Sequence, residues 1–322
     1  MNVLLTSSGR RVALVRAFRQ ALDDLHPSSK VFTADVSPWS AALRASDERV
    51  LLPPCEDAGY APALLDLVRR RDIRIVIPLI DTELLVLACR RDEFLAAGCQ
   101  VIVSDPAVVE TTRDKRLSVR RFRELGFRAP RVFDDEALER ADDLPYPVFM
   151  KPAAGSSSID AMRVDTPEEL RFWFRRLKDP VVQSFERGLE YTIDVFADLD
   201  GRARCAVPRQ RWEVRAGEIS KGRTVKDRRL MEAGKRLVER LGGCRGCVTL
   251  QCFDVGANQE PVFFEANLRF GGGFPLSHAA GADYPRWILE MCEGKAIGEF
   301  DDWRDGLVML RYDEAVYFHA GS

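Results

Sequence analysis

The chain has 322 residues, of which 46% are hydrophobic and 30% charged, and its 48 basic and 50 acidic side chains leave a formal net charge of -2. This composition is that of a globular protein with two lobes or three compact subdomains. The near-neutral charge excludes a general attraction to nucleic acids or membranes. No apolar run is long enough to span a bilayer, and the start MNVLLTSSGRR lacks the features of a signal peptide, so we expect a cytoplasmic protein.

Strands and helices are predicted to alternate over residues 1–111. Apolar runs at 2–6, 31–35, 73–79 and 100–105 are typical of buried strands, and the segments 11–25 and 61–71 carry apolar residues at helical spacing. This alternation predicts a parallel sheet in an N-terminal α/β domain. The turn TSSGRR after the first strand lacks GxGxxG, which disfavours a dinucleotide-dependent oxidoreductase.

Two further subdomains are predicted, over residues 112–180 and 181–322. The first begins with a basic helix at 115–125 and contains an apolar strand, a small-residue loop and a helix that Thr166 caps. The second contains strands at 180–198, a helix capped by Asp227, and two closing strands at 248–255 and 261–270. Cys244 and Cys247 form a single CxxC pair, for which a turn between helix and strand is favoured over a metal or redox role.

The closing strands carry a candidate metal site. Side chains alternate across a strand, so Glu265, Asn267 and Arg269 share one face of FFEANLRF while the residues between them share the other. Gln251 lies on the preceding strand, and a hairpin would bring it to the same place. One carboxylate and two amide oxygens suit Mg²⁺, which keeps waters and takes further ligands from phosphates. A polar hairpin face in solvent is the alternative.

Candidate phosphate ligands precede this hairpin. Lys151 ends an apolar strand, and the loop that follows offers main-chain N–H groups and hydroxyls, in Gly155, Ser156, Ser157 and Ser158. Lys115 could equally be a solvated lysine paired with Asp114. Farther on, Glu190 is a candidate for ribose hydroxyls, and the main chain of Ser184 and Phe185 for an adenine edge.

The order of these features resembles the ATP-grasp family. The sequence has a helix lysine, a strand lysine, a Gly-Ser loop, a connector with GxE, a basic segment and Gln…Glu-x-Asn-x-Arg, over about residues 112 to 300. Within the family it looks most like the synthetase halves of carbamoyl-phosphate synthase and the ligase of pyrrolysine biosynthesis. The resemblance implies an α/β fold, with a parallel N-terminal domain at 1–111 and two ATP-grasp subdomains at 112–180 and 181–322.

The resemblance also implies roles for single residues. Lys115 and Lys151 would contact ATP, residues 155–158 would form a lid over the phosphates, and Glu190 would contact the ribose. Gln183, Ser184 and Phe185 would form the adenine hinge. Gln251, Glu265 and Asn267 would hold one or two Mg²⁺ (or Mn²⁺) ions, with Gln251 the weaker ligand because many members have an acid there.

The predicted reaction is ATP-dependent ligation of a carboxylate and an amine through an acyl phosphate, releasing ADP and phosphate. The substrates are expected to be small and amino-acid-like, and a homodimer is left open. Arg269, beside three glycines, is predicted to grip an anion. Arg211 and Lys221, from a basic segment expected to cover the site, are predicted to contact substrate or the γ-phosphate. The alternatives are a carbamoyl-phosphate-type or carboxylating phosphotransferase and a non-catalytic ATP-binding regulator.

Overall fold

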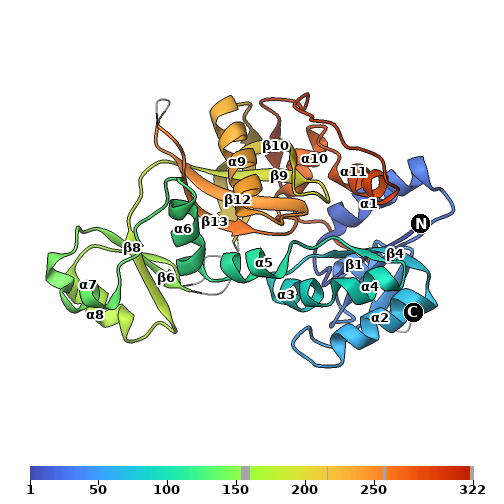
Figure 1. Cartoon of the computed structure of the whole chain (residues 1–322), viewed down its shortest axis with the longest axis horizontal. Coiled ribbons are helices and arrows are strands. Elements are labelled where there is room, and N and C mark those ends of the chain that lie inside the picture. Colours follow the sequence, from blue (N-terminus) through green and yellow to red (C-terminus); the bar gives the residue numbers. More distant parts are fainter. Residues whose placement is uncertain (154–159, 216, 257–258, 320–322) are drawn as a thin grey trace.

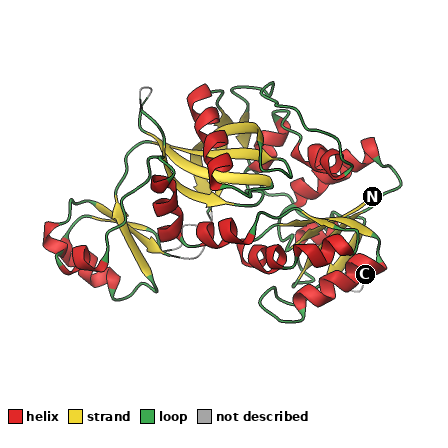
Figure 2. Ribbon diagram, viewed as in Figure 1, coloured by secondary structure: helices red, strands yellow, loops and turns green. Residues whose placement is uncertain are grey.

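The computed structural model describes residues 1–153, 160–215, 217–256 and 259–319. Three sheets organise this part of the chain, with five, three and six strands. The three-stranded sheet lies at one end of the molecule, and the other two sheets lie close together (Figures 1 and 2). The predicted α/β class is confirmed.

The N-terminal sheet is parallel throughout, with the order β3-β2-β1-β4-β5. Its strands are β1 (Asn2–Thr6), β2 (Val31–Asp35), β3 (Glu48–Leu51), β4 (Ile73–Pro78) and β5 (Gln100–Val101). The associated helices are α1 (Val12–Leu25), α2 (Tyr60–Arg70), α3 (Asp81–Cys89), α4 (Arg91–Ala96) and α5 (Pro106–Arg113). Strands β1, β2 and β4 are almost wholly buried, as their continuous apolar runs predicted.

The small sheet is antiparallel, with the order β7-β6-β8. Its elements are β6 (Val148–Pro152), β7 (Met162–Val164), β8 (Pro180–Ser184), α7 (Asp135–Glu139) and α8 (Pro167–Phe174), and α6 (Lys115–Glu124) precedes them. Thr166 caps α8 as predicted, because its hydroxyl accepts from the Glu169 N–H at 3.2 Å. The predicted boundary at residue 180 falls inside the structure's β8, which pairs with β6, so the small sheet extends to Ser184.

The large sheet is antiparallel, with the order β13-β12-β9-β10-β11-β14. Its strands are β9 (Leu189–Ala197), β10 (Ala203–Arg215), β11 (Glu218–Thr224), β12 (Gly246–Asp254), β13 (Val262–Asn267) and β14 (Val308–Leu310). Its helices are α9 (Arg228–Leu241), α10 (Phe274–Ala279) and α11 (Tyr284–Cys292). The basic segment expected to cover the site forms much of the antiparallel pair β10–β11.

Two hydrophobic cores hold these sheets. One runs continuously from the N-terminal domain into the large sheet, and it includes Leu4, Phe18, Ile193 and Phe270. The small sheet has a core of its own around Met150. The N-terminal domain and the large sheet therefore form one packed body, to which the small subdomain is attached.

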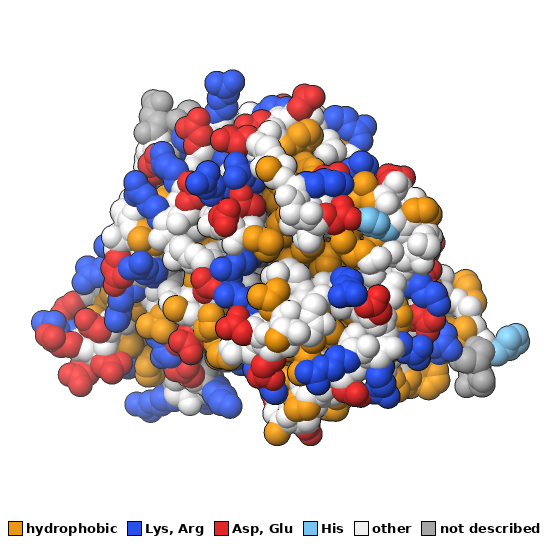
Figure 3. Space-filling view, turned by 45° about the vertical axis from the view of Figure 1, so that its right-hand side comes forward, with side chains coloured by type: hydrophobic (Ala, Val, Ile, Leu, Met, Phe, Trp, Pro, Cys, Tyr) orange, Lys and Arg blue, Asp and Glu red, His pale blue; other side chains and the backbone are white. Residues whose placement is uncertain are grey.

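The CxxC pair lies at a turn between a helix and a strand, as predicted, and the surface carries charges of both signs. Cys244 lies in the turn between α9 and β12, and Cys247 lies at the start of β12. Both are free and buried, and burial raises the pKa of the Cys244 thiol to about 12. Acidic and basic side chains are interspersed over the face that Figure 3 presents. No helix in the described part of the chain is long and apolar enough to cross a membrane.

Candidate active site

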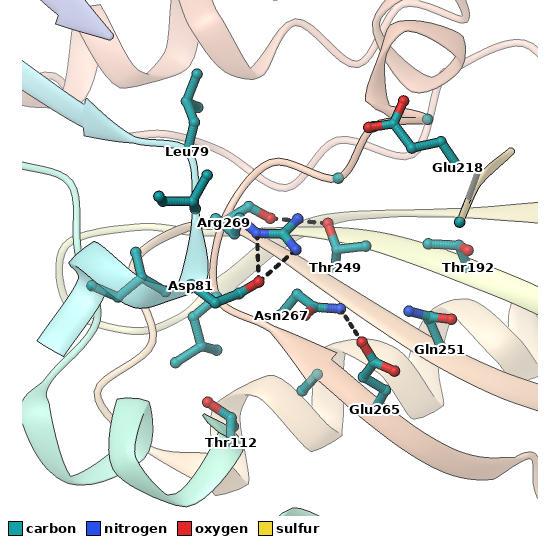
Figure 4. A pocket seen from close by; sticks show the side chains of 18 of the residues that line it. Leu79, Asp81, Thr112, Thr192, Glu218, Thr249, Gln251, Glu265, Asn267 and Arg269 are labelled. Atoms are coloured by element: carbon teal, nitrogen blue, oxygen red, sulfur yellow. Dashed lines mark hydrogen bonds and ion pairs between the residues drawn. The ribbon is translucent and has the colours of Figure 1, made fainter. Parts of the chain in front are cut away.

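The hairpin of β12 and β13 brings the three predicted metal ligands together. Gln251 pairs with Glu265 across the two strands, and Thr249 pairs with Asn267. The Asn267 amide nitrogen donates to Glu265 Oε1 at 2.9 Å, and Gln251 lies beside them on the neighbouring strand (Figure 4). Directly opposed residues of an antiparallel pair project from the same face. The predicted convergence on one face is therefore present.

A cavity of about 520 Å³ lies over this hairpin. Its walls come from the large sheet, from the segment that joins β4 to α3, and from the ends of α5 and α6. The charged side chains that line it are Arg11, Asp81, Arg113, Lys115, Arg209, Arg211, Glu218, Glu265 and Arg269. Six of these are basic and three are acidic, so the cavity favours an anionic ligand.

Arg269 points into the cavity and binds Asp81, the first residue of α3. Its Nε and Nη2 atoms donate to Asp81 Oδ2 at 3.1 and 2.7 Å, and its Nη1 donates to the Phe270 carbonyl at 3.2 Å (Figure 4). Asp81 therefore joins the N-terminal domain to the segment that follows β13. The role of Arg269 as an anion clamp stays a prediction, and an incoming anion would have to compete with Asp81.

The buried pair of Arg209 and Asp194 supports the same wall. Arg209 Nε and Nη2 donate to the two carboxylate oxygens of Asp194 at 2.8 and 3.0 Å, and the side chains are 1% and 0% exposed. Thr249 and Ser277 also donate to Asp194, at 3.2 and 2.6 Å. A buried ion pair needs such additional hydrogen bonds to offset the loss of hydration.

The three glycines after Arg269 are required by the side chains that pack against them. A Cβ atom on Gly271 would collide with Thr249, one on Gly272 with Glu218, and one on Gly273 with the Arg209 guanidinium. The backbone at these glycines therefore lies closer to the neighbouring side chains than any larger residue would allow.

Arg211 and Glu190 form an ion pair at the edge of the cavity. Arg211 Nε lies 3.1 Å from Glu190 Oε1, and its Nη1 donates to Thr192 and Gln251 at 3.4 Å each. Burial lowers the pKa of Arg211 and raises that of Glu190, while each partner favours the charged form of the other. The structure thus places Arg211 next to Gln251, a predicted metal ligand. Glu190, the predicted ribose contact, is paired with the same arginine.

Lys115 and Lys151 approach the hairpin from the small subdomain. Lys115 lines the cavity at the first position of α6, and its N–H donates to the Ala153 carbonyl at 3.0 Å. Asp114 caps this helix and pairs with Arg116 at 2.8 Å. Lys151 is 5% exposed at the end of β6. Burial lowers the pKa of Lys151 to about 8, which nearby Glu265 opposes and Lys115 reinforces.

The predicted adenine hinge lies at the end of β8. Gln183 is buried, and its Oε1 atom has no hydrogen-bond partner in the described part of the chain. The Ser184 hydroxyl accepts from the Arg131 N–H at 3.0 Å, and the Arg163 guanidinium lies 5.2 Å from the centre of the Phe185 ring. The predicted lid residues Gly155, Ser156, Ser157 and Ser158 lie outside the described residues.

The structure does not bring Lys221 to the cavity. Lys221 is exposed and pairs with Glu213 at 2.7 Å. Arg211 lies opposite Gly222, so the neighbouring Lys221 projects from the other face of β11. Glu218 of the same strand lines the cavity instead.

Two protein-family models match separate parts of the chain. Residues 3–102 match "PylC-like, N-terminal domain", and residues 176–315 match "ATP-grasp in the biosynthetic pathway with Ter operon". Over residues 176–315 the sequence therefore resembles the ATP-grasp family. The predicted family is therefore confirmed, and the first match agrees with the resemblance to the pyrrolysine-type ligase.

Solved ATP-grasp structures have the same fold as this chain. The biotin carboxylase domain of Hydrogenobacter thermophilus 2-oxoglutarate carboxylase, in complex with MgADP, ADP and bicarbonate, is 17% identical with a TM-score of 0.74, over 95% of this chain and 73% of that chain. The Bacillus licheniformis L-amino acid ligase is 18% identical with a TM-score of 0.68, over 90% and 73%. The Staphylococcus aureus N5-carboxyaminoimidazole synthetase, complexed with ADP, is 13% identical with a TM-score of 0.71, over 90% and 77%. No curated protein matches the chain.

Several residues of this ATP-grasp cavity were not predicted from the sequence. Asp81, Arg11, Glu218 and Arg209 all line it. The position of Asp81 directly after the apolar run IRIVIPLI was an available signal, because strand ends of parallel sheets face ligands. Arg11 and Glu218 had no comparable signal, since their positions depend on how the N-terminal domain packs against the large sheet.

Proposed function

We propose that this ATP-grasp protein is an ATP-dependent carboxylate–amine ligase. A carboxylate oxygen attacks the γ-phosphorus of ATP, the bond from that phosphorus to ADP breaks, and an acyl phosphate forms. An amine nitrogen then attacks the acyl carbon and loses a proton, the bond from that carbon to the phosphate oxygen breaks, and an amide and phosphate are formed. The observation that carries this proposal is the hairpin of Gln251, Glu265 and Asn267, which opens into a basic cavity beside Lys115.

The donor set of the hairpin fits Mg²⁺ bound together with a nucleotide. Glu265 is its single carboxylate, and Gln251 and Asn267 supply amide oxygens. No group of three or more His, Cys, Asp or Glu residues in the described chain could hold a metal. Such an incomplete oxygen set suits Mg²⁺, which keeps waters and takes its other ligands from phosphates. When bound, the ion would neutralise negative charge on the transferred phosphoryl group.

The small subdomain offers groups that fit the rest of a nucleotide. Gln183 Oε1 is a buried acceptor to which no described residue donates, which is costly unless a ligand such as the amino group of adenine supplies a donor. Lys151 and Lys115 supply positive charge toward the hairpin. Arg211 would orient Gln251 and Glu190 through its contacts with both.

The size of the cavity supports an acceptor larger than bicarbonate. A volume of about 520 Å³ falls within the usual range for small-molecule sites and far exceeds that of bicarbonate. Arg11, Arg209 and Arg269 make one wall suitable for carboxylates, as amino-acid-like substrates require. Bicarbonate is a ligand of the carboxylase neighbour, so carboxylation is the competing reaction.

Product analysis tests the proposal. The purified protein is incubated with Mg-ATP and pooled amino acids, and nucleotide, phosphate and new amide masses are measured. We expect ADP, phosphate and a new amide in equal amounts. ADP formation that depends on bicarbonate would identify a carboxylating enzyme instead, and ATP binding without turnover on any carboxylate would indicate a regulator.

Replacing Lys151 tests its contact with the nucleotide. Lys151→Ala should weaken ATP binding by about 1.5–3 kcal/mol, the usual value of a charge-assisted hydrogen bond. Because the pKa of Lys151 is about 8, affinity in the wild type should also fall as the pH rises from 7 to 9 and the lysine loses its proton. Titration calorimetry at several pH values measures both effects.

The matched control for this experiment is Lys151→Arg. Its guanidinium stays charged at all these pH values, so the fall in affinity between pH 7 and 9 should disappear. An unchanged affinity in Lys151→Ala, or the same pH dependence in all three proteins, would show that Lys151 does not contact the nucleotide.

A further inference from the structure

A second cavity, of about 280 Å³, lies inside the N-terminal domain. It is formed where β1, β2, β3 and β4 end, and its walls include Ser7, Asp35, Pro53 and Thr82. The strand order β3-β2-β1-β4-β5 reverses direction between β1 and β4. In open parallel sheets, ligands bind outside the carboxyl ends of the strands at such a switch point.

The chemistry of the walls excludes a nucleotide. No Lys, Arg or His is among the described residues that line this cavity, so nothing there neutralises a phosphate. The N–H of Gly9, which could have faced a phosphate, donates to Asp35 Oδ2 at 2.7 Å, and the N–H of Ser37 donates to Asp35 Oδ1 at 3.2 Å. The loop after β1 is thus closed on Asp35.

The same walls suit a small cation with an apolar body. Ala34, Val36, Leu52, Pro53, Pro54 and Ile80 supply apolar surface. Asp35 and Glu56 supply negative charge, and the hydroxyls of Ser7, Tyr60 and Thr82 are also at the wall. Apolar enclosure with a few polar groups is the usual composition of a small-molecule site.

A buried carboxylate connects this cavity to the candidate active site. Glu83 is fully buried and accepts from the Tyr60 hydroxyl at 2.6 Å and the Ser7 hydroxyl at 3.1 Å, both at the wall of the second cavity. Its other oxygen accepts from the N–H groups of Leu79 and Ile80, at 2.8 and 3.2 Å. Leu79 and Ile80 line the larger cavity directly before Asp81, and Ile80 lines both.

We propose that the second cavity binds a small primary amine, with its ammonium group toward Asp35 and Glu56 and its carbon skeleton against the prolines and Ile80. This site is separate from the nucleotide and acceptor sites of the proposed ligase and does not depend on that reaction. An occupant that contacts Tyr60 or Ser7 would change the hydrogen bonds that these hydroxyls donate to Glu83. The Glu83 carboxylate also accepts from the main chain just before α3.

Titration calorimetry without nucleotide tests this site with three probes of one shape. Benzylamine carries a positive charge on an aromatic skeleton, benzoate carries a negative charge, and benzyl alcohol is neutral. We expect saturable one-to-one binding of benzylamine, and binding of the other two at least about tenfold weaker. Absence of saturable benzylamine binding, or equal affinity for benzyl alcohol, would overturn the proposal.

Two arginine substitutions locate the binding site. Val36 is 57% exposed and lines the cavity, whereas Leu51 is 55% exposed nearby and does not line it. Val36→Arg should weaken benzylamine binding at least about tenfold, because it places a like charge at the wall. Leu51→Arg adds the same charge outside the cavity and should retain most of the affinity. Equal losses in both variants, or none in Val36→Arg, would place the amine elsewhere; circular dichroism verifies that both variants fold.

Discussion

Glu265→Gln is expected to reduce ATP turnover at least about 100-fold, as is usual when one preorganised electrostatic group is removed from an active site. Glu265 is the single carboxylate among the three predicted ligands, so its loss would leave Mg²⁺ only neutral oxygens from Gln251 and Asn267. The fold should persist, because a glutamine carbonyl can accept the 2.9 Å hydrogen bond that the Asn267 amide donates to Glu265. Initial rates of ADP release at saturating Mg-ATP measure the effect.

Glu260→Gln is the matched control for this variant. Glu260 lies in the turn of the same hairpin and forms an exposed ion pair with Arg236 at 3.1 Å. Exposed pairs of this kind contribute little, so its activity should equal that of the wild type. If Glu265→Gln retained the activity of Glu260→Gln, the assignment of the metal site to this hairpin would be wrong.

Asp194→Asn is expected to lower the free energy of unfolding by about 3–5 kcal/mol, the typical loss when one partner of a buried ion pair is removed. The substitution leaves the buried Arg209 guanidinium without a counter-charge, since both of its bonded nitrogens donate to Asp194. It also replaces one of the two carboxylate oxygens, which accept separately from Thr249 and Ser277, with an amide group that cannot accept. Urea unfolding followed by circular dichroism measures the change.

Two further variants make this stability result specific. Asp313→Asn removes one partner of the exposed pair with Arg215 and should leave the free energy of unfolding close to that of the wild type. Combining Arg209→Met with Asp194→Asn removes the uncompensated cation and should recover part of the lost stability. An Asp194→Asn variant as stable as Asp313→Asn would show that the buried pair does not stabilise the wall of the cavity.

The sequence by itself determined much of the local secondary structure of this protein, including helix caps and the side chains that share one face of a strand. The alternation of side chains along a strand placed Glu265 and Asn267 on one face, and the expected hairpin predicted that Gln251 would lie near them. The structure supplied the register, in which Gln251 lies opposite Glu265. Four of the five N-terminal strands were predictable because continuous apolar runs are needed in a parallel sheet that helices cover. The fifth, β3, was not predicted, because its residues alternate between partly buried and exposed and form no apolar run. Caps such as Thr166 and Asp227 were predictable because their effect depends only on neighbouring residues.

Only the tertiary structure decided which charged groups meet. Asp81 and Arg269 are 188 residues apart, and no local pattern could pair them. Lys221 was assigned to the site because its segment is basic, but pairing opposite Glu213 turns it to the other face of β11. The physical reason is that strand periodicity and capping act over a few residues, whereas ion pairs across the cavity depend on how the N-terminal domain packs on the large sheet.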